Sequence, residues 1–158
     1  IPEFMRDTVV PQADIVTPNH FELDFLAGRS TSTLAEILDA VDDVRERGPR
    51  DMLVTSVLHG DVPEGRLDVV AVSDEGAWAV ETPLLPINPN GCGDVTAALY
   101  LAHLRSTGSA AEALARTTSS VFAILEQTIA AGTREIQLVA AQGAIAEPPM
   151  NFEVRRLR

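Results

Sequence analysis

The sequence predicts an α/β fold in which a largely parallel β-sheet is covered by helices. Short apolar runs rich in β-branched residues alternate along the chain with longer stretches in which apolar residues recur at helical spacing. The chain has 158 residues, of which 46% are hydrophobic, and this is enough to bury one core. We therefore expect one domain, or part of one.

The first third of the chain has the pattern of two strands separated by two helices. Residues 14–17 and residues 52–57 are apolar runs typical of buried strands. Between them, residues 20–27 predict a short helix, and apolar residues at helical spacing between Ser32 and Gly48 predict a longer amphipathic helix. This alternation of strands and helices is what favours a parallel sheet.

The middle of the chain predicts a β-hairpin followed by a loop. Residues 67–73 and 77–80 have the composition of strands, and the Asp-Glu-Gly sequence at 74–76 is typical of a turn between them. Residues 82–90 contain three prolines and two asparagines, so we expect a loop there.

The last part of the chain predicts three helices. The first follows the Gly-Cys-Gly-Asp sequence at 91–94 and ends at Gly108, and Ser109 can cap the second. Residues 134–145 predict the third helix, and a short tail begins at Glu147.

The composition excludes several classes of function. The formal net charge is −11, and the 12 basic residues, all of them arginines, are scattered, so the surface is not that of a nucleic-acid-binding protein. No apolar run approaches the length that a membrane span requires. The single cysteine, Cys92, excludes a disulfide within the chain and is typical of a reducing compartment, so we expect a cytoplasmic protein.

Gly91-Cys92-Gly93-Asp94 lies where the predicted loop becomes a helix. Two glycines allow the backbone N–H groups to point toward one place, and the helix dipole adds partial positive charge there. The turn is therefore a candidate anion-binding site, to which Cys92 would contribute only its N–H. Asp94 can also be an ordinary helix-capping residue, and the tetrapeptide alone does not decide between the two roles.

Two segments resemble a known family. They are residues 9–22, which end in Thr-Pro-Asn-His-Phe-Glu after a predicted strand, and residues 91–99, Gly-Cys-Gly-Asp-Val-Thr-Ala-Ala-Leu. Shorter matching segments occur in the same order at 2–3, 48–49, 53–56, 82–84 and 138–142. The sequence thereby resembles the pyridoxal kinases of the ribokinase-like superfamily over nearly its whole length. The resemblance implies a three-layer α/β sandwich, and that residues 1–4 are natural sequence.

The resemblance also implies a reaction. ATP would phosphorylate the 5′-hydroxymethyl group of pyridoxal or a related vitamer, giving pyridoxal 5′-phosphate in vitamin B6 salvage. Asp94 would be the base that accepts the hydroxyl proton. The N–H groups of Gly91, Cys92 and Gly93 would stabilise the charge on the transferred γ-phosphoryl group.

The same resemblance assigns residues to the nucleotide and its metal ion. Glu22, with Asn19 beside it, would hold Mg²⁺ through water, whereas an exposed helix-start glutamate is the alternative. Thr55 and Ser56 would supply hydroxyl groups to phosphate or ribose, and a monovalent cation could also be required. The nucleotide would be bordered by Thr82, Pro83, Leu84 and Leu85.

The sequence departs from this family in two respects. It contains no lysine, where one branch of pyridoxal kinases has a lysine near the position of Thr55. It also resembles only the C-terminal half, so the part that holds the pyridoxal ring would be absent. We expect the chain alone to be inactive, and the complete enzyme to be a homodimer. The alternatives are a hydroxymethylpyrimidine or sugar kinase of the same superfamily, or a nucleotide-binding fragment without catalysis.

Overall fold

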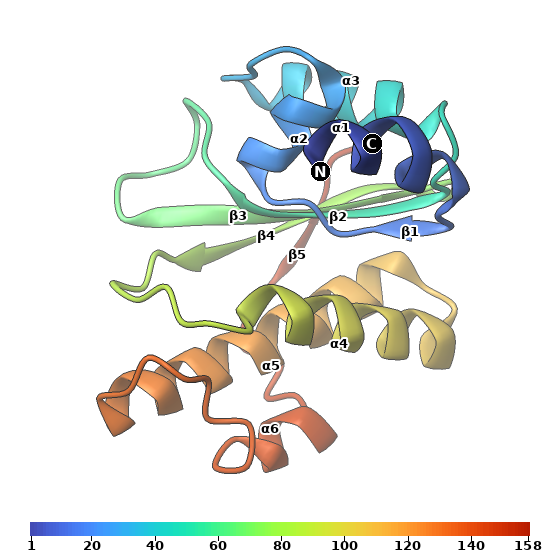
Figure 1. The fold of residues 1–158 in the computed structure, drawn as a ribbon. Coiled ribbons are helices and arrows are strands. Elements are labelled where there is room, and N and C mark those ends of the chain that lie inside the picture. The colour runs from blue at the N-terminus through green and yellow to red at the C-terminus, as the bar shows by residue number, and fades with distance from the viewer.

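The computed structural model describes residues 1–158 and has a mixed β-sheet with helices on both faces (Figure 1). The sheet contains five strands in the order β1-β2-β3-β4-β5. Their bounds are β1 Ile15–Val16, β2 Asp51–Val57, β3 Arg66–Ser73, β4 Gly76–Pro83 and β5 Val154–Arg156. The α/β class is as predicted.

The predicted preponderance of parallel strands is wrong for this chain. Only β1 and β2 run parallel, whereas the pairs β2–β3, β3–β4 and β4–β5 are antiparallel. For β2–β3 and β3–β4 the reason is the length of the connections, because a parallel pair needs a crossover of a dozen residues or more. The helices α2 and α3 supply such a crossover between β1 and β2. By contrast, residues 58–65 and the two-residue turn Asp74–Glu75 join strands that must reverse direction.

One face of the sheet is covered by the N-terminal segment and two helices (Figure 1). The N-terminal segment comprises α1 (Pro2–Phe4), a π-helical turn (Met5–Val9) and a 3₁₀ turn (Val10–Gln12). The helices are α2 (His20–Ala27) and α3 (Leu34–Arg45). The largest of the three buried clusters lies between this layer and the sheet, and it includes Leu23, Ile37, Val41, Val44, Met52, Val54, Val70 and Val72.

The opposite face is covered by α4 (Cys92–Thr107) and α5 (Ala110–Ala131), which pack against each other (Figure 1). Gly108 separates them in a left-handed conformation, as the sequence predicted, and Ser109 caps α5 by accepting the N–H of Glu112. No helix of the chain is both long enough and apolar enough to span a membrane.

The predicted helix over residues 134–145 is wrong except at its end, where α6 (Gln142–Ala146) forms. The backbone at the start of this segment bonds to other parts of the chain. Asn90 donates its N–H to the carbonyl of Arg134, and Gln137 donates its N–H to Thr128 Oγ1 in α5. These tertiary hydrogen bonds outweigh the helical pattern of the local sequence.

The predicted C-terminal tail contains a strand, and its side chains reach across the sheet. In β5, Arg155 donates to Asp68 Oδ2 at 2.9 Å, and His59 Nε2 lies 3.2 Å from the same oxygen. The side chain of Asp68 is fully buried and its Oδ1 has no partner, so Arg155 and His59 stabilise a carboxylate that water cannot reach. The end of the chain is thus tied to β3 and to the loop after β2.

The hairpin of β3 and β4 is confirmed, with continuous pairing from Ser73 and Gly76 to Arg66 and Pro83. The second strand extends further than predicted, so that Thr82 and Pro83 lie in β4 and not in the loop that follows it.

Candidate functional site

A cleft of about 760 Å³ opens at one end of the sheet. Figure 1 shows that α2 and α4, although they cover opposite faces, both begin at this end. Nine of the residues predicted to form a site line the cleft, namely Asn19, Thr55, Ser56, Thr82, Pro83, Leu84, Leu85, Cys92 and Gly93. The other three, Glu22, Gly91 and Asp94, are not part of the lining but lie in the helix starts that border it.

The first turn of α4 presents unpaired backbone N–H groups beside a carboxylate. Gly91 is the N-cap residue, with φ of +85°, and makes no side-chain cap. Asp94 is exposed in the first turn and caps nothing, contrary to the capping alternative. A Cβ built on Gly93 would meet no atom within 4 Å, so the space beside this turn is open. A helix start of this kind suits an anion.

The two glycines of this turn should respond oppositely to alanine. Gly91→Ala is expected to destabilise the fold by about 1–2 kcal/mol, because an L-residue is strained in the left-handed region. Its Cβ would also lie 3.3 Å from Ile136 Cδ1. Gly93→Ala should be neutral or stabilising by up to about 1 kcal/mol, since Gly93 lies within the helix and has free space. Urea unfolding of both variants measures the difference, and equal stabilities would contradict it.

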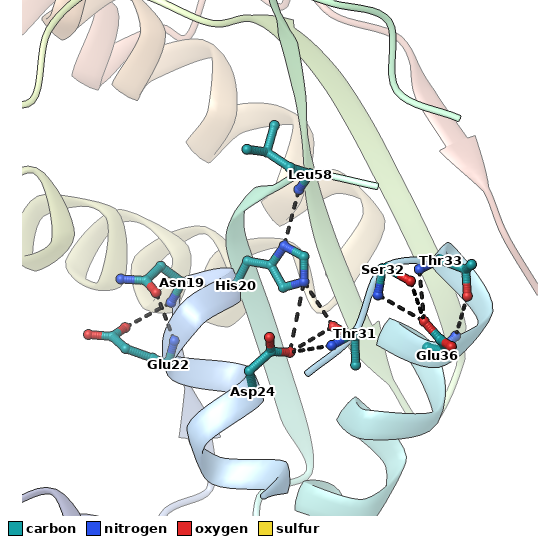
Figure 2. A network of polar contacts seen from close by, with 9 residues as sticks. All are labelled: Asn19, His20, Glu22, Asp24, Thr31, Ser32, Thr33, Glu36 and Leu58. Atoms are coloured by element: carbon teal, nitrogen blue, oxygen red, sulfur yellow. Dashed lines mark hydrogen bonds and ion pairs between the residues drawn. The ribbon is translucent and has the colours of Figure 1, made fainter. Parts of the chain in front are cut away.

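The start of α2 is held by a reciprocal capping box (Figure 2). Asn19 Oδ1 accepts the N–H of Glu22 at 2.9 Å, and Glu22 Oε2 accepts the N–H of Asn19 at 2.8 Å. Both side chains therefore have a structural task. One carboxylate oxygen of Glu22 and the amide nitrogen of Asn19 make no hydrogen bond within the chain, so they remain available to a ligand.

The end of β2 is bulged where it lines the cleft. The pairing with β3 shifts between Val54 and Val57, and Ser56 adopts φ of +54°, which is rare for a residue other than glycine. The N–H of Thr55 donates to the carbonyl of Pro18 at 3.0 Å, so that the bulge is attached to the segment before α2. Strained backbone of this kind is frequent at binding sites.

The floor of the cleft comes from residues that the sequence did not single out. Leu67 and Val69 of β3 and a row of side chains on α5 form it. Among the latter, Thr117 and Thr118 are buried, and neither hydroxyl group has a hydrogen-bond partner. In the sequence these threonines belong to the apolar face of a helix, and only the position of α5 over the sheet turns them toward a cavity. The α5 residues of the lining are Thr117, Thr118, Val121, Phe122 and Leu125.

The cleft carries little formal charge. Asp24 is the only acidic residue in its lining, and no arginine contributes to it. Attraction for an anion therefore depends on the helix starts of α2 and α4. No three His, Cys, Asp or Glu side chains lie together in an arrangement that could hold a metal ion. Burial raises the pKa of the Cys92 thiol above its ordinary value, which keeps this side chain neutral.

Comparison with known proteins agrees with this architecture. The profile of the phosphomethylpyrimidine kinase family matches residues 1–139. Pyridoxal kinase PdxY of Rubrobacter xylanophilus is 52% identical over 99% of this chain and 54% of its own length. Pyridoxal kinase PdxY of Leifsonia xyli is 49% identical over 99% of this chain and 56% of its own length. The chain thus spans about half the length of the curated relatives it matches.

Solved structures confirm the ribokinase-like fold. Pyridoxal kinase from Entamoeba histolytica superimposes with a TM-score of 0.82 at 23% identity, over 99% of this chain and 54% of that one. Pyridoxal kinase from Leishmania donovani in complex with ADP gives a TM-score of 0.85 at 20% identity, over 99% of this chain and 55% of that one. The profile match over residues 1–139, more than half of the chain, shows that the chain belongs to the phosphomethylpyrimidine kinase family.

Proposed function

We propose that this chain is the ATP-binding and catalytic part of a pyridoxal kinase. The observation that carries the proposal is the first turn of α4. Its unpaired N–H groups and the carboxylate of Asp94, which makes no capping hydrogen bond, lie together at the edge of the cleft. An anion-binding turn and a base in adjacent residues are what phosphoryl transfer to an alcohol requires. The identity of 52% to a protein named pyridoxal kinase supports this substrate class.

In the proposed reaction the 5′-hydroxyl oxygen of pyridoxal bonds to the γ-phosphorus of ATP. The bond between that phosphorus and the bridging oxygen of the β-phosphate breaks, and ADP leaves. Asp94 accepts the hydroxyl proton, while the N–H groups of Gly91, Cys92 and Gly93 stabilise the negative charge of the transferred group. The open space beside Gly93 leaves room for a phosphoryl group.

The proposal includes Mg²⁺ with the nucleotide. Glu22 fits this role because one of its oxygens is not used by the capping box, and Asn19 adds a neutral group beside it. The chain does not supply a complete set of ligands, so water and phosphate oxygens would complete the coordination. Bound there, Mg²⁺ would neutralise phosphate charge. Thr55 and Ser56 would donate hydroxyl groups to phosphate or ribose, and Thr82 to Leu85 would border the nucleotide.

Turnover, vitamer selection and assembly belong to the complete enzyme in this proposal. Because these residues match about half of each relative, we infer that by themselves they do not phosphorylate pyridoxal. Homodimerisation and a cytoplasmic location are parts of the proposal that rest on the family resemblance and on the single cysteine. The family profile also makes a phosphomethylpyrimidine substrate a second candidate. Rates with pyridoxal, with hydroxymethylpyrimidine and with its phosphate would discriminate between the two substrate classes.

The only cysteine of the chain offers a direct test, because Cys92 lies in the proposed phosphate-binding turn. The thiolate is the form that iodoacetamide attacks, so the raised pKa predicts slower alkylation than that of an ordinary thiol and a rate that increases with pH. Mg²⁺ with ATP at ten times its Kd should slow the reaction about tenfold, since only the free protein reacts. Mg²⁺ with sulfate is the control. Equal rates with and without ATP would overturn the assignment of the cleft to nucleotide.

A further inference from the structure

The imidazole ring of His20 is part of a continuous hydrogen-bond chain at the edge of the cleft (Figure 2). The N–H of Leu58 lies 3.2 Å from His20 Nδ1, and His20 Nε2 lies 2.8 Å from Thr31 Oγ1. Thr31 in turn donates both its hydroxyl, at 2.7 Å, and its N–H, at 3.1 Å, to Asp24 Oδ1. The ring thus connects α2 with the end of β2 and with the loop before α3.

These partners determine the tautomer of the ring. A backbone N–H points at Nδ1, so Nδ1 must be an acceptor and the ring proton must be on Nε2. The hydroxyl proton of Thr31 is given to Asp24, which leaves Thr31 Oγ1 free to accept from Nε2. Each proton is used once.

The two segments joined by this ring carry the groups that the proposed reaction needs. His20 is the first residue of α2 and follows Asn19 directly, and Leu58 comes two residues after the left-handed Ser56. Two hydrogen bonds therefore flank the bulge. One runs from the N–H of Leu58 to His20 Nδ1, and the other runs from the N–H of Thr55 to the carbonyl of Pro18. Without the first of these, the start of α2 would be held against the end of β2 on one side of the bulge only, by the backbone bridge between Asn19 and Thr55 to which the second belongs.

We propose that His20, through hydrogen bonds at both ring nitrogens, is a positioning residue that holds Thr55 and Ser56 in register with Asn19 and Glu22. This inference rests on the proposed function, in which the first pair contacts phosphate and the second pair contacts the metal ion. The two contacts come from different elements and must be satisfied by one nucleotide. Loss of the connection would let the bulge move relative to α2, and a small displacement of a positioned group weakens binding.

Two substitutions distinguish the roles of the two nitrogen atoms of the ring. In His20→Asn, Oδ1 is as many bonds from the backbone as Nδ1, so it can still accept from Leu58. In His20→Gln, Nε2 can still donate to Thr31, but no acceptor is placed for Leu58. We expect His20→Gln to raise the Kd for Mg²⁺·ATP about tenfold, because the bulge would no longer be held in place relative to α2, and His20→Asn to stay within about threefold of the unsubstituted chain.

The Kd follows from protection of Cys92 against alkylation, and hydrogen exchange of the Leu58 amide reports the connection itself without any nucleotide. Exchange of this amide should accelerate in His20→Gln and stay slow in His20→Asn. The same two substitutions at His103 are the control, because His103 is outside the cleft lining and its Nε2 has no partner. If His20→Gln does not fold, Thr31→Val removes the hydroxyl that fixes the tautomer, and both the exchange rate and the Kd should increase.

The outcomes separate this inference from the function on which it rests. Equal Kd values for His20→Asn and His20→Gln would overturn the positioning role, as would fast Leu58 exchange with an unchanged Kd. If the unsubstituted chain does not bind Mg²⁺·ATP, the proposed function fails and the positioning role fails with it. The exchange data would then still show whether the ring joins α2 to β2.

Discussion

Replacing Asp94 by asparagine is expected to lower the kcat for phosphorylation of pyridoxal by about 10²–10⁴, the range for loss of a positioned general base. Asparagine keeps the shape of the side chain but cannot accept the hydroxyl proton. ATP binding should change little, because the N–H groups of the α4 turn and the metal ion are unaffected. Steady-state kinetics should be measured in a protein that contains this chain together with the part present in its full-length relatives.

The fold should survive this substitution, because Asp94 is exposed and caps nothing. Loss of a negative charge in the first turn of a helix costs about 0.3–1 kcal/mol. Glu112→Gln is the matched control, since Glu112 is the acidic residue in the first turn of α5 and does not line the cleft. A wild-type kcat for Asp94→Asn would show that Asp94 is not the base, and the mechanism proposed above would have to be abandoned.

Replacing Glu22 by glutamine should raise the Mg²⁺ concentration needed for half-maximal activity by about 10- to 100-fold, the usual effect of losing a group that holds a metal ion through an intermediate ligand. Glutamine at this position can still complete the capping box with Asn19, so the melting temperature should hardly change. The measurement is the rate of phosphorylation against Mg²⁺ concentration at saturating ATP, with thermal unfolding in parallel.

The chain supplies a matched control for the loss of the Glu22 carboxylate. In α3, Thr33 and Glu36 form a second capping box of the same kind, and it lies outside the cleft (Figure 2). Glu36→Gln should therefore leave the Mg²⁺ requirement unchanged. If Glu22→Gln behaved in the same way as Glu36→Gln, Glu22 would be a capping residue only, and another ligand for the metal ion would have to be found.

The strands β1 to β4 and the helices α2 to α5 could be predicted because their signals are local, whereas β5 was not predicted. The hairpin of β3 and β4 follows from two β-branched runs around a turn. The C-terminal end of α4 follows from Gly108, and the start of α5 follows from Ser109. The segment before α6 could not be predicted, since its hydrogen bonds go to Asn90 and Thr128, which are distant in the sequence. The predicted strand directions were wrong because they were inferred from the order of helices and strands alone. The short connections between β2, β3 and β4 were not taken into account.

Those parts of the candidate site that come from a single short segment of the sequence were predictable. Gly91 to Asp94 and Asn19 to Glu22 each combine a helix start with polar groups, and both border the cleft. The orphaned hydroxyl groups of Thr117 and Thr118 were not predictable, because their pattern is that of a core helix. The tautomer of His20 was not predictable either, since it depends on the N–H of Leu58, which follows β2 and is distant from His20 in the sequence.

The pairing of β4 with β5 bears on the order in which the chain folds. Val80 pairs with Val154, so α4 and α5, which both contribute to the lining of the cleft, lie in the long loop that this pairing closes. Closing a long loop is slow compared with forming the β3–β4 hairpin, and it requires that the last residues have been synthesised. Until Arg155 arrives, the buried carboxylate of Asp68 has only His59 as a partner. We therefore expect the C-terminal strand to dock late, and the Asp68 carboxylate to stay hydrated until it does.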